Sequence, residues 1–264
     1  MDQQDINPRS FYESRIWKSH VIGNPYEIAR VQYIQDFLDE GSGTTVLDAG
    51  CGGGTYTSVL VEASLLIAAD ISFSAVNAAK QNLSLYDNVF FVVCNLTHLP
   101  FRDAAVDKVA CIDVLEHVDE PQKALDEMSR VLRSGGQMLL FTACGENKLT
   151  LEHMLKPLFG RLINSIRSRF GHVSIFTTAG IREMLSRDFL INRIEYMHHW
   201  AGWLLKFFWD VKHMNSLESH QALLEPTGSS LSRILWLPLE AEFKLFRTRS
   251  LGTEATVKAT KKRY

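Results

Sequence analysis

The sequence predicts an α/β protein built on a doubly wound sheet. Short apolar runs with few polar interruptions recur through the first half of the chain, which is typical of parallel strands buried on both faces. Segments with helical periodicity stand between these runs. In such a sheet the ligands bind beyond the carboxyl ends of the strands, so we expect the functional residues just after each strand.

The first five predicted strands are the apolar runs at 44–49, 65–70, 89–94, 106–113 and 137–143. Helical periodicity predicts helices at 25–40, 72–85 and 121–132. Pro121 suits the first position of the third helix, and Gly135 and Gly136 suit its stop.

The second half of the sequence is less regular. Residues 171–186 predict a turn and a helix, 189–199 a strand, and 254–263 a final strand with a basic end. The roughly 50 residues between these two strands are rich in Trp and Phe and lack alternation, so we interpret them as a helical insertion. The predicted domains are an N-terminal helical lid at 1–43, a core at 44–197 and 250–264, and the insertion at 198–249.

Composition limits the class of protein. With 264 residues, 46% hydrophobic and 22% charged, the chain can bury one large core. The net charge of -2 gives no basic excess, which disfavours a nucleic-acid partner. No apolar run approaches the roughly 20 residues that span a bilayer, and no signal pattern opens the chain, so we expect a cytoplasmic protein. Its four irregularly spaced cysteines are predicted to be reduced and mostly buried: Cys51, Cys94, Cys111 and Cys144.

A glycine-rich loop directly follows the first predicted strand. It contains Gly50, Gly52, Gly53 and Gly54, and Asp70 ends the next strand, 18 positions beyond Gly52. Glycines let backbone N–H groups approach a ligand, and an acid at this strand end accepts hydrogen bonds from ribose hydroxyls. The pattern indicates a nucleoside ligand. Thr55 replaces the third glycine of a dinucleotide loop, which favours a ligand without a pyrophosphate.

The loop and Asp70, with NLTHLPF (95–101), the stretch 106–136 and MLLFTA (138–143), resemble the class I methyltransferases that use S-adenosylmethionine. The resemblance covers about 100 contiguous residues. It implies a Rossmann-like methyltransferase sheet, mostly parallel with an antiparallel last strand, and S-adenosyl-L-methionine as the cofactor. The density of aromatic residues in the helical insertion at 198–249 predicts that it caps the methyl acceptor.

The resemblance implies cofactor contacts along the ends of the predicted strands. The loop after Asp48 would face the methionine moiety, Asp70 would hold the ribose, and Ile71 would pack on adenine. Asn95 stands where many relatives carry an aspartate for the adenine amino group. The complete predicted set is Tyr12, Trp17, Asp48, Ala49, Gly50, Cys51, Gly52, Asp70, Ile71, Asn95, Leu96, Ile112 and His117.

The stretch DVLEHV, Asp113 to Val118, allows three interpretations. Its acids cap a turn while His117 closes over the cofactor, or His117 is a general base. In the third, Asp113, Glu116 and His117 bind a divalent ion, because the stretch resembles the ExxEH of ubiquinone-pathway O-methyltransferases and small-RNA 3′-end methyltransferases. We prefer the first interpretation and predict no metal ligand. His117 and His199, which ends a predicted strand, are the candidate catalytic residues.

The insertion concentrates aromatic residues that could contact an acceptor. They line an apolar pocket, lie on a membrane interface or form the core of a cap subdomain, so membrane association is left open: Trp200, Trp203, Phe207, Phe208, Trp209 and Trp236. We expect in-line methyl transfer to an oxygen, less readily a carbon or nitrogen, of a hydrophobic or aromatic small molecule. The alternatives are methylation of RNA or protein, a non-catalytic cofactor-binding partner subunit, and a nicotinamide reductase. The sequence predicts no oligomeric state.

Overall fold

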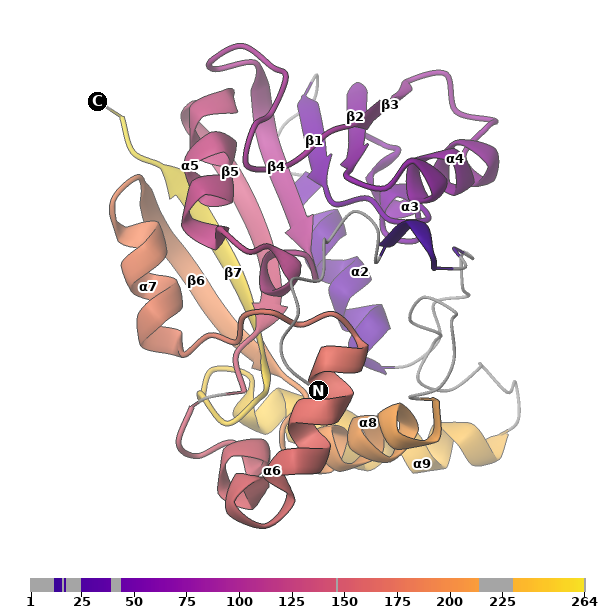
Figure 1. Ribbon diagram of the computed structural model, residues 1–264, viewed down its shortest axis with the longest axis vertical. Helices are drawn as coiled ribbons and strands as arrows, with labels where there is room; N and C mark the ends of the chain where they lie inside the picture. The colour runs from indigo at the N-terminus through magenta and orange to yellow at the C-terminus, as the bar shows by residue number, and fades with distance from the viewer. Residues whose placement is uncertain are drawn as a thin grey trace.

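A computed structural model describes residues 12–15, 17, 25–38, 44–145, 147–213 and 230–263. Its centre is a seven-stranded sheet in the order β3-β2-β1-β4-β5-β7-β6, with helices on both faces and a helical layer at one end (Figure 1). The strands are β1 (Thr45–Ala49), β2 (Leu65–Asp70), β3 (Val89–Val93), β4 (Val106–Ile112), β5 (Leu132–Ala143), β6 (Phe189–Met197) and β7 (Glu254–Lys261).

The strand directions confirm the predicted sheet. β1 pairs in parallel with β2 and β4, and β3 and β5 extend the parallel region on either side. The last strand, β7, runs antiparallel to both of its neighbours, β5 and β6. The carboxyl ends of the parallel strands therefore meet at one edge, where a ligand site is expected.

Two apolar layers cover the sheet. In the first layer, α5 (Pro121–Val131) and α7 (Thr178–Ser186) pack against one face of the sheet. In the second layer, four helices pack against the opposite face: α2 (Pro25–Leu38), α3 (Thr57–Leu60), α4 (Phe73–Asn82) and part of α9 (Ser230–Phe246). Both faces are thus excluded from water, which explains the nearly continuous apolar runs of the central strands.

The predicted helix stop at Gly135 and Gly136 is wrong. Helix α5 ends at Val131, and the chain enters β5 directly at Leu132. The glycines instead lie where the pairing of β5 with β4 is irregular. Gly135 has φ 74°, and a Cβ on Gly136 would lie 2.8 Å from the Asp107 carbonyl oxygen. Two glycines after a helical pattern therefore marked a close approach of two strands rather than a helix end.

A helix that the sequence analysis did not predict lies between β5 and α7. Helix α6 (Leu151–Arg169) begins where the Thr150 side chain accepts a hydrogen bond from the His153 N–H, at 3.2 Å, and it contains Pro157. The proline interrupts the helical pattern in the sequence. α6 packs against α8 (Trp200–His213), and with α9 these helices form the layer at the lower end of Figure 1.

The predicted insertion at 198–249 contains α8 and α9, with residues 214–229 outside the described part of the chain. Much of the predicted lid also lies outside it, namely 1–11, 16, 18–24 and 39–43. Within the described residues, every helix is too short or too polar to cross a bilayer. All four cysteines are unpaired, and three of them are buried.

Candidate functional site

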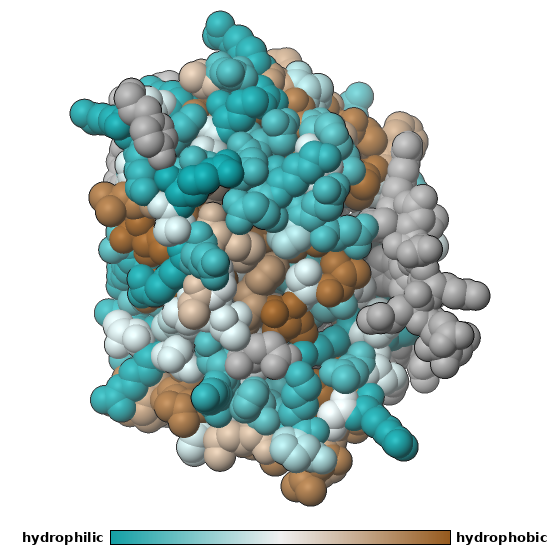
Figure 2. All heavy atoms as spheres, turned by 60° about the vertical axis from the view of Figure 1, so that its left-hand side comes forward, coloured by the Kyte–Doolittle hydropathy of each residue, from teal (hydrophilic) through white to brown (hydrophobic). Residues whose placement is uncertain are grey.

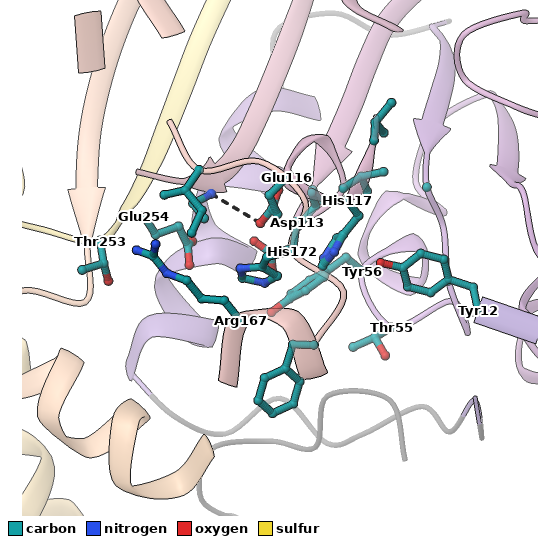
Figure 3. Close-up of a pocket in the computed structure, with 18 of the residues that line it drawn as sticks. Tyr12, Thr55, Tyr56, Asp113, Glu116, His117, Arg167, His172, Thr253 and Glu254 are labelled. Carbon is teal, nitrogen blue, oxygen red and sulfur yellow. Dashed lines mark hydrogen bonds between the residues drawn. The ribbon is translucent and has the colours of Figure 1, made fainter. Parts of the chain in front are cut away.

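A cavity of about 440 Å³ opens at the carboxyl ends of β1, β2 and β4 (Figure 3). Its volume is within the range of small-molecule sites. One half is lined by the glycine loop, Asp70 and the residues after β3, and the other by α6, α8 and the start of β7. One cavity therefore joins the predicted cofactor residues to α6 and α8, which we call the cap helices.

The glycine loop takes a conformation that favours glycine. Gly50, Gly52 and Gly54 have φ of 97°, 50° and 90°. The N–H groups of Gly50 and Cys51 both donate to the Ala69 carbonyl, at 2.8 and 2.9 Å, which holds the loop against β2. A Cβ on Gly50 would lie 2.2 Å from a methyl group of Val114, so no larger residue fits there without displacement.

Asp70 is fixed by backbone donors on both of its carboxylate oxygens. The Gly52 N–H donates to Oδ2 at 2.9 Å, and the Ser72 N–H donates to Oδ1 at 3.0 Å. Burial raises the pKa of this carboxyl, while the backbone hydrogen bonds act in the opposite direction. Each oxygen keeps a further lone pair, so the carboxylate can accept hydrogen bonds from a ligand.

Asp48, at the other side of the loop, is almost fully buried. Its Oδ2 accepts a hydrogen bond from the Thr57 hydroxyl at 2.6 Å. Burial raises the pKa of Asp48 to about 7, with Asp70 adding to the rise. A cationic ligand group beside it would favour the ionised form.

Most of the other predicted cofactor residues also line the cavity. Ile71, Leu96 and Ile112 contribute apolar surface, and the Asn95 amide oxygen accepts a hydrogen bond from the Thr97 N–H at 3.0 Å. Ala49 is an exception, because it is fully buried within β1 and does not line the cavity.

The N-terminal segment lies over this half of the cavity. Glu13 accepts hydrogen bonds from the Phe73 and Ser74 N–H groups, at 2.6 and 3.0 Å, at the start of α4. The rings of Tyr12 and His117 form a T-shaped pair with centroids 5.7 Å apart, and the Trp17 ring lies against Gly52. Tyr12 and Trp17 are therefore close to the predicted cofactor loop and to His117.

Asp113, the first residue of DVLEHV, forms an ion pair that the sequence analysis did not predict. It has φ 55°, and its oxygens accept hydrogen bonds from Arg30 at 2.7 and 3.2 Å. Arg30 also donates to Glu254 through Nε at 3.0 Å and to the Tyr56 hydroxyl at 3.0 Å. Arg30 and His198 hold the pKa of Glu254 near 2, whereas burial raises that of Asp113. One buried guanidinium thus links the ends of β4 and β7 at the cavity.

Glu116 and His117 face different surroundings. The Glu116 carboxylate accepts from the Thr142 hydroxyl at 3.0 Å and the Ala143 N–H at 3.3 Å, and burial raises its pKa to about 8. His117 Nδ1 lies 3.0 Å from the Gly171 carbonyl oxygen, which only a protonated nitrogen can bond. Burial lowers the pKa of His117 to about 4, so its Nε2 is an acceptor at neutral pH.

Three side chains around DVLEHV could hold a metal ion. Glu116, His117 and His172 each offer one ligand atom, and these atoms lie within 4.8 Å of one another. The metal interpretation of the sequence named Asp113 instead of His172, but Asp113 is paired with Arg30. His172, which is 55 positions from His117, joins the group because the loop after α6 returns to the cavity.

We predict that dialysis against EDTA leaves the affinity for S-adenosylhomocysteine unchanged. Both oxygens of Glu116 already accept hydrogen bonds, from the Thr142 hydroxyl and the Ala143 N–H, so this carboxyl is held in place without an ion. Calorimetric titrations of S-adenosylhomocysteine into dialysed and undialysed samples of the wild type and of His172→Ala provide the check. A lower affinity after dialysis, restored by zinc or magnesium in the wild type but not in His172→Ala, would contradict the prediction.

The two histidines after β6 have different surroundings. His198, with φ 49°, lines the cavity, and its Nε2 lies 3.4 Å from a Glu254 oxygen. His199, one of the two predicted catalytic residues, does not line it: the ring is buried near Phe246, and burial lowers its pKa to about 4. The geometry therefore gives no support to a catalytic role for His199.

The cap half of the cavity is largely aromatic and apolar. Trp203 stacks on Phe207 at 4.9 Å between centroids, and its indole N–H donates to Glu152 at 2.8 Å. Ile163 and Ile166 of α6 line the same space. The side chains of Trp209 and Trp236 lie outside the described part of the structure. Sequence periodicity missed the α6 contribution because it missed the helix.

Comparison with known proteins shows that the part of the chain that forms most of the sheet is similar to methyltransferases. Residues 47–140 match the family described as methyltransferase domain. A demethylmenaquinone methyltransferase of Clavibacter sepedonicus is 36% identical over 100 residues, 38% of this chain and 41% of that protein. A ubiquinone/menaquinone biosynthesis C-methyltransferase of Haemophilus ducreyi is 32% identical over 50% of this chain and 48% of its own length. The chain thus spans less than half of each of these relatives.

A solved structure shares the fold over most of the chain. The cyclase SpnF superimposes with a TM-score of 0.64 at 16% identity, covering 95% of this chain and 87% of its own. At that identity the likeness concerns the fold, which agrees with the predicted Rossmann-like methyltransferase sheet.

Proposed function

We propose that this chain, which carries a class I S-adenosylmethionine-dependent methyltransferase domain, methylates an oxygen of a hydrophobic or aromatic small molecule. The observation that carries the proposal is the single cavity, with the glycine loop and Asp70 in one half and the apolar side chains of α6 and α8 in the other. Relatives named for quinone pathways also support a small-molecule acceptor.

In the proposed complex, Asp70 binds the ribose hydroxyls and Ile71 packs on adenine. Asp48 lies beside the amino acid moiety, and Tyr12 and Trp17 close over the cofactor. When bound, the cofactor supplies a methyl group already activated on a sulfonium. The contribution of the chain is to align the acceptor atom in line with that methyl group and to exclude water.

An oxygen acceptor is favoured because the acceptor side of the cavity carries proton acceptors. Asp113 is held by Arg30, and the His117 ring is held by Gly171 with Nε2 as its accepting atom. A hydroxyl nucleophile must lose a proton, and we assign that proton to Asp113, because burial raises the pKa of Asp113 but lowers that of His117. Carbon is the alternative acceptor, since one relative is named a C-methyltransferase, and nitrogen is third.

Calorimetry tests the cofactor part of the proposal. We expect micromolar binding of S-adenosylhomocysteine and no binding of NADH, because the loop lacks the third glycine of dinucleotide sites. The reverse preference would overturn the proposal. Incubation with methyl-labelled cofactor and paired alkylphenols and alkylphenyl methyl ethers then tests the acceptor atom. If only the phenols take up label and the product is a labelled methyl ether, the acceptor atom is oxygen. If the label is found on a ring carbon, the acceptor atom is carbon.

A further inference from the structure

We propose that the outer face of the cap helices docks on an anionic lipid surface, from which the acceptor enters the cavity. This surface, the cap face, consists of Leu149, Met154, Leu158, Trp200, Leu204 and Phe208. The docking itself is independent of the reaction, and only the entry of the acceptor rests on the proposed function.

The cap face consists of exposed apolar side chains on two helices that pack against each other, α6 and α8, and on the segment before α6. Leu158 is 78% exposed, Phe208 65% and Leu149 61%, which is unusual for large apolar side chains. Positions 200, 204 and 208 are four residues apart in α8 and so lie on one side of it. The Trp200 indole N–H donates to the Leu149 carbonyl at 3.2 Å, which joins this stripe to the segment before α6.

The inner faces of the same helices line the cavity. Trp203 and Phe207 of α8, and Ile163 and Ile166 of α6, all contact it. A helix that packs only on a core needs one apolar face, but α8 has two, one toward the cavity and one toward solvent. The rings of Phe207 and Phe208 are neighbours, with centroids 5.9 Å apart, so apolar surface runs from the cavity wall to the exterior.

The excess of exposed cations around the cap face favours an anionic lipid surface as the partner. Among the described side chains of 147–171, 200–213 and 230–249, exposed ionisable groups are six cations and one anion, Glu240. The cations are Lys148, Arg161, Arg169, Lys244, Arg249 and Arg247, the last of which pairs with Glu195 of β6 at 3.4 Å. The whole chain has a net charge of -2, so positive charge is concentrated in the cap. Basic residues beside exposed apolar residues fit an interface of anionic headgroups and acyl chains.

Figure 2 shows separate brown apolar side chains at the lower edge of the molecule, at the level where Figure 1 places α6, α8 and α9, with teal and white side chains between them. Because the described helices are too short or too polar to cross a bilayer, the contact proposed is peripheral, with the cap face in the headgroup region.

Sedimentation with vesicles tests the proposal. The probes are vesicles of phosphatidylcholine containing one quarter phosphatidylglycerol and vesicles of phosphatidylcholine alone. We expect at least about tenfold stronger partitioning to the anionic vesicles, weakened by high salt. The variant Leu204→Ser with Phe208→Ser should lose about tenfold of this partitioning, because two apolar side chains leave the interface. The matched control is Leu85→Ser with Leu190→Ser, exposed 91% and 61% on the sheet part, and should bind as the wild type does.

Equal binding to the two vesicle types, absence of binding, or wild-type binding by the α8 variant would overturn the proposal. If the α8 variant does not fold, Lys148→Ser with Arg161→Ser replaces it, and retention of wild-type anionic preference in that variant is the contradicting result. Affinity for S-adenosylhomocysteine is measured on every sample. Its loss in the wild type would contradict the proposed function, and vesicle partitioning separately decides the docking.

Discussion

Replacing Arg30 by methionine is expected to lower the free energy of unfolding by about 3–5 kcal/mol. Arg30 is the buried cation between Asp113 and Glu254, and methionine fills a similar volume without charge. Removing one partner of a buried ion pair leaves the other carboxylates uncompensated, which costs more than the pair itself contributes. Chemical denaturation at neutral pH measures the loss.

The pH dependence of this loss is a second readout. In the wild type the Glu254 pKa is near 2, below its ordinary value of 4.5, so this group stabilises the fold above about pH 4.5 and the contribution is lost as pH falls toward 2. Without Arg30 we expect burial, the largest effect on this group, to hold the pKa of Glu254 above 4.5. The variant should then lose stability as pH rises from that value, because the folded state holds a proton that the unfolded state releases.

Two further variants separate charge from packing. Arg30→Met combined with Asp113→Asn and Glu254→Gln should regain much of the loss, since no buried charge remains unpaired. Arg133→Met removes a pair with Asp107 in which the arginine is 58% exposed, and should cost less than about 1 kcal/mol. A single Arg30→Met variant as stable as Arg133→Met would show that the buried network is not needed.

Sequence patterns predicted the parts of the site that are local. The loop from Gly50 to Gly54 follows β1 directly, and Asp70 ends β2, so the order of strands and the fixed spacing place them together. The backbone conformation of the loop requires glycine, and hydrogen bonding to ribose requires an acid at the end of β2. Both requirements are visible in the residue types.

The acceptor side combines segments that are far apart in sequence. Arg30 meets Glu254 across 224 positions, and His117 meets the loop at Gly171 across 54, so no short motif contains either contact. For His198 and His199, too, the sequence pattern did not predict which side chain faces the cavity. The strand predicted through His199 ends at Met197, and the positive φ of His198 turns its side chain to the cavity, where strand alternation no longer applies.

Replacing Asp70 by asparagine is expected to weaken S-adenosylhomocysteine binding by about 100-fold. In the proposed complex two charge-assisted hydrogen bonds to the ribose are lost or weakened, each of about 1.5–3 kcal/mol. The amide also conflicts with the protein. Gly52 and Ser72 donate to different oxygens of Asp70, so an NH₂ group in either place faces a donor. Calorimetry measures the affinity, and thermal unfolding checks that the variant is folded.

The ligand can be changed together with the residue. Methylthioadenosine and its 2′,3′-dideoxy analogue differ only in the two ribose hydroxyls, so the wild type should prefer the former by a large factor and Asp70→Asn should prefer it little. Asp48→Asn, which alters the other acid of the loop, should keep the wild-type preference because Asp48 is bonded to Thr57 and predicted to face the methionine moiety. If Asp70→Asn retained the full preference, the ribose would be bound elsewhere, and Asp70 would serve only to hold Gly52 and Ser72 in place.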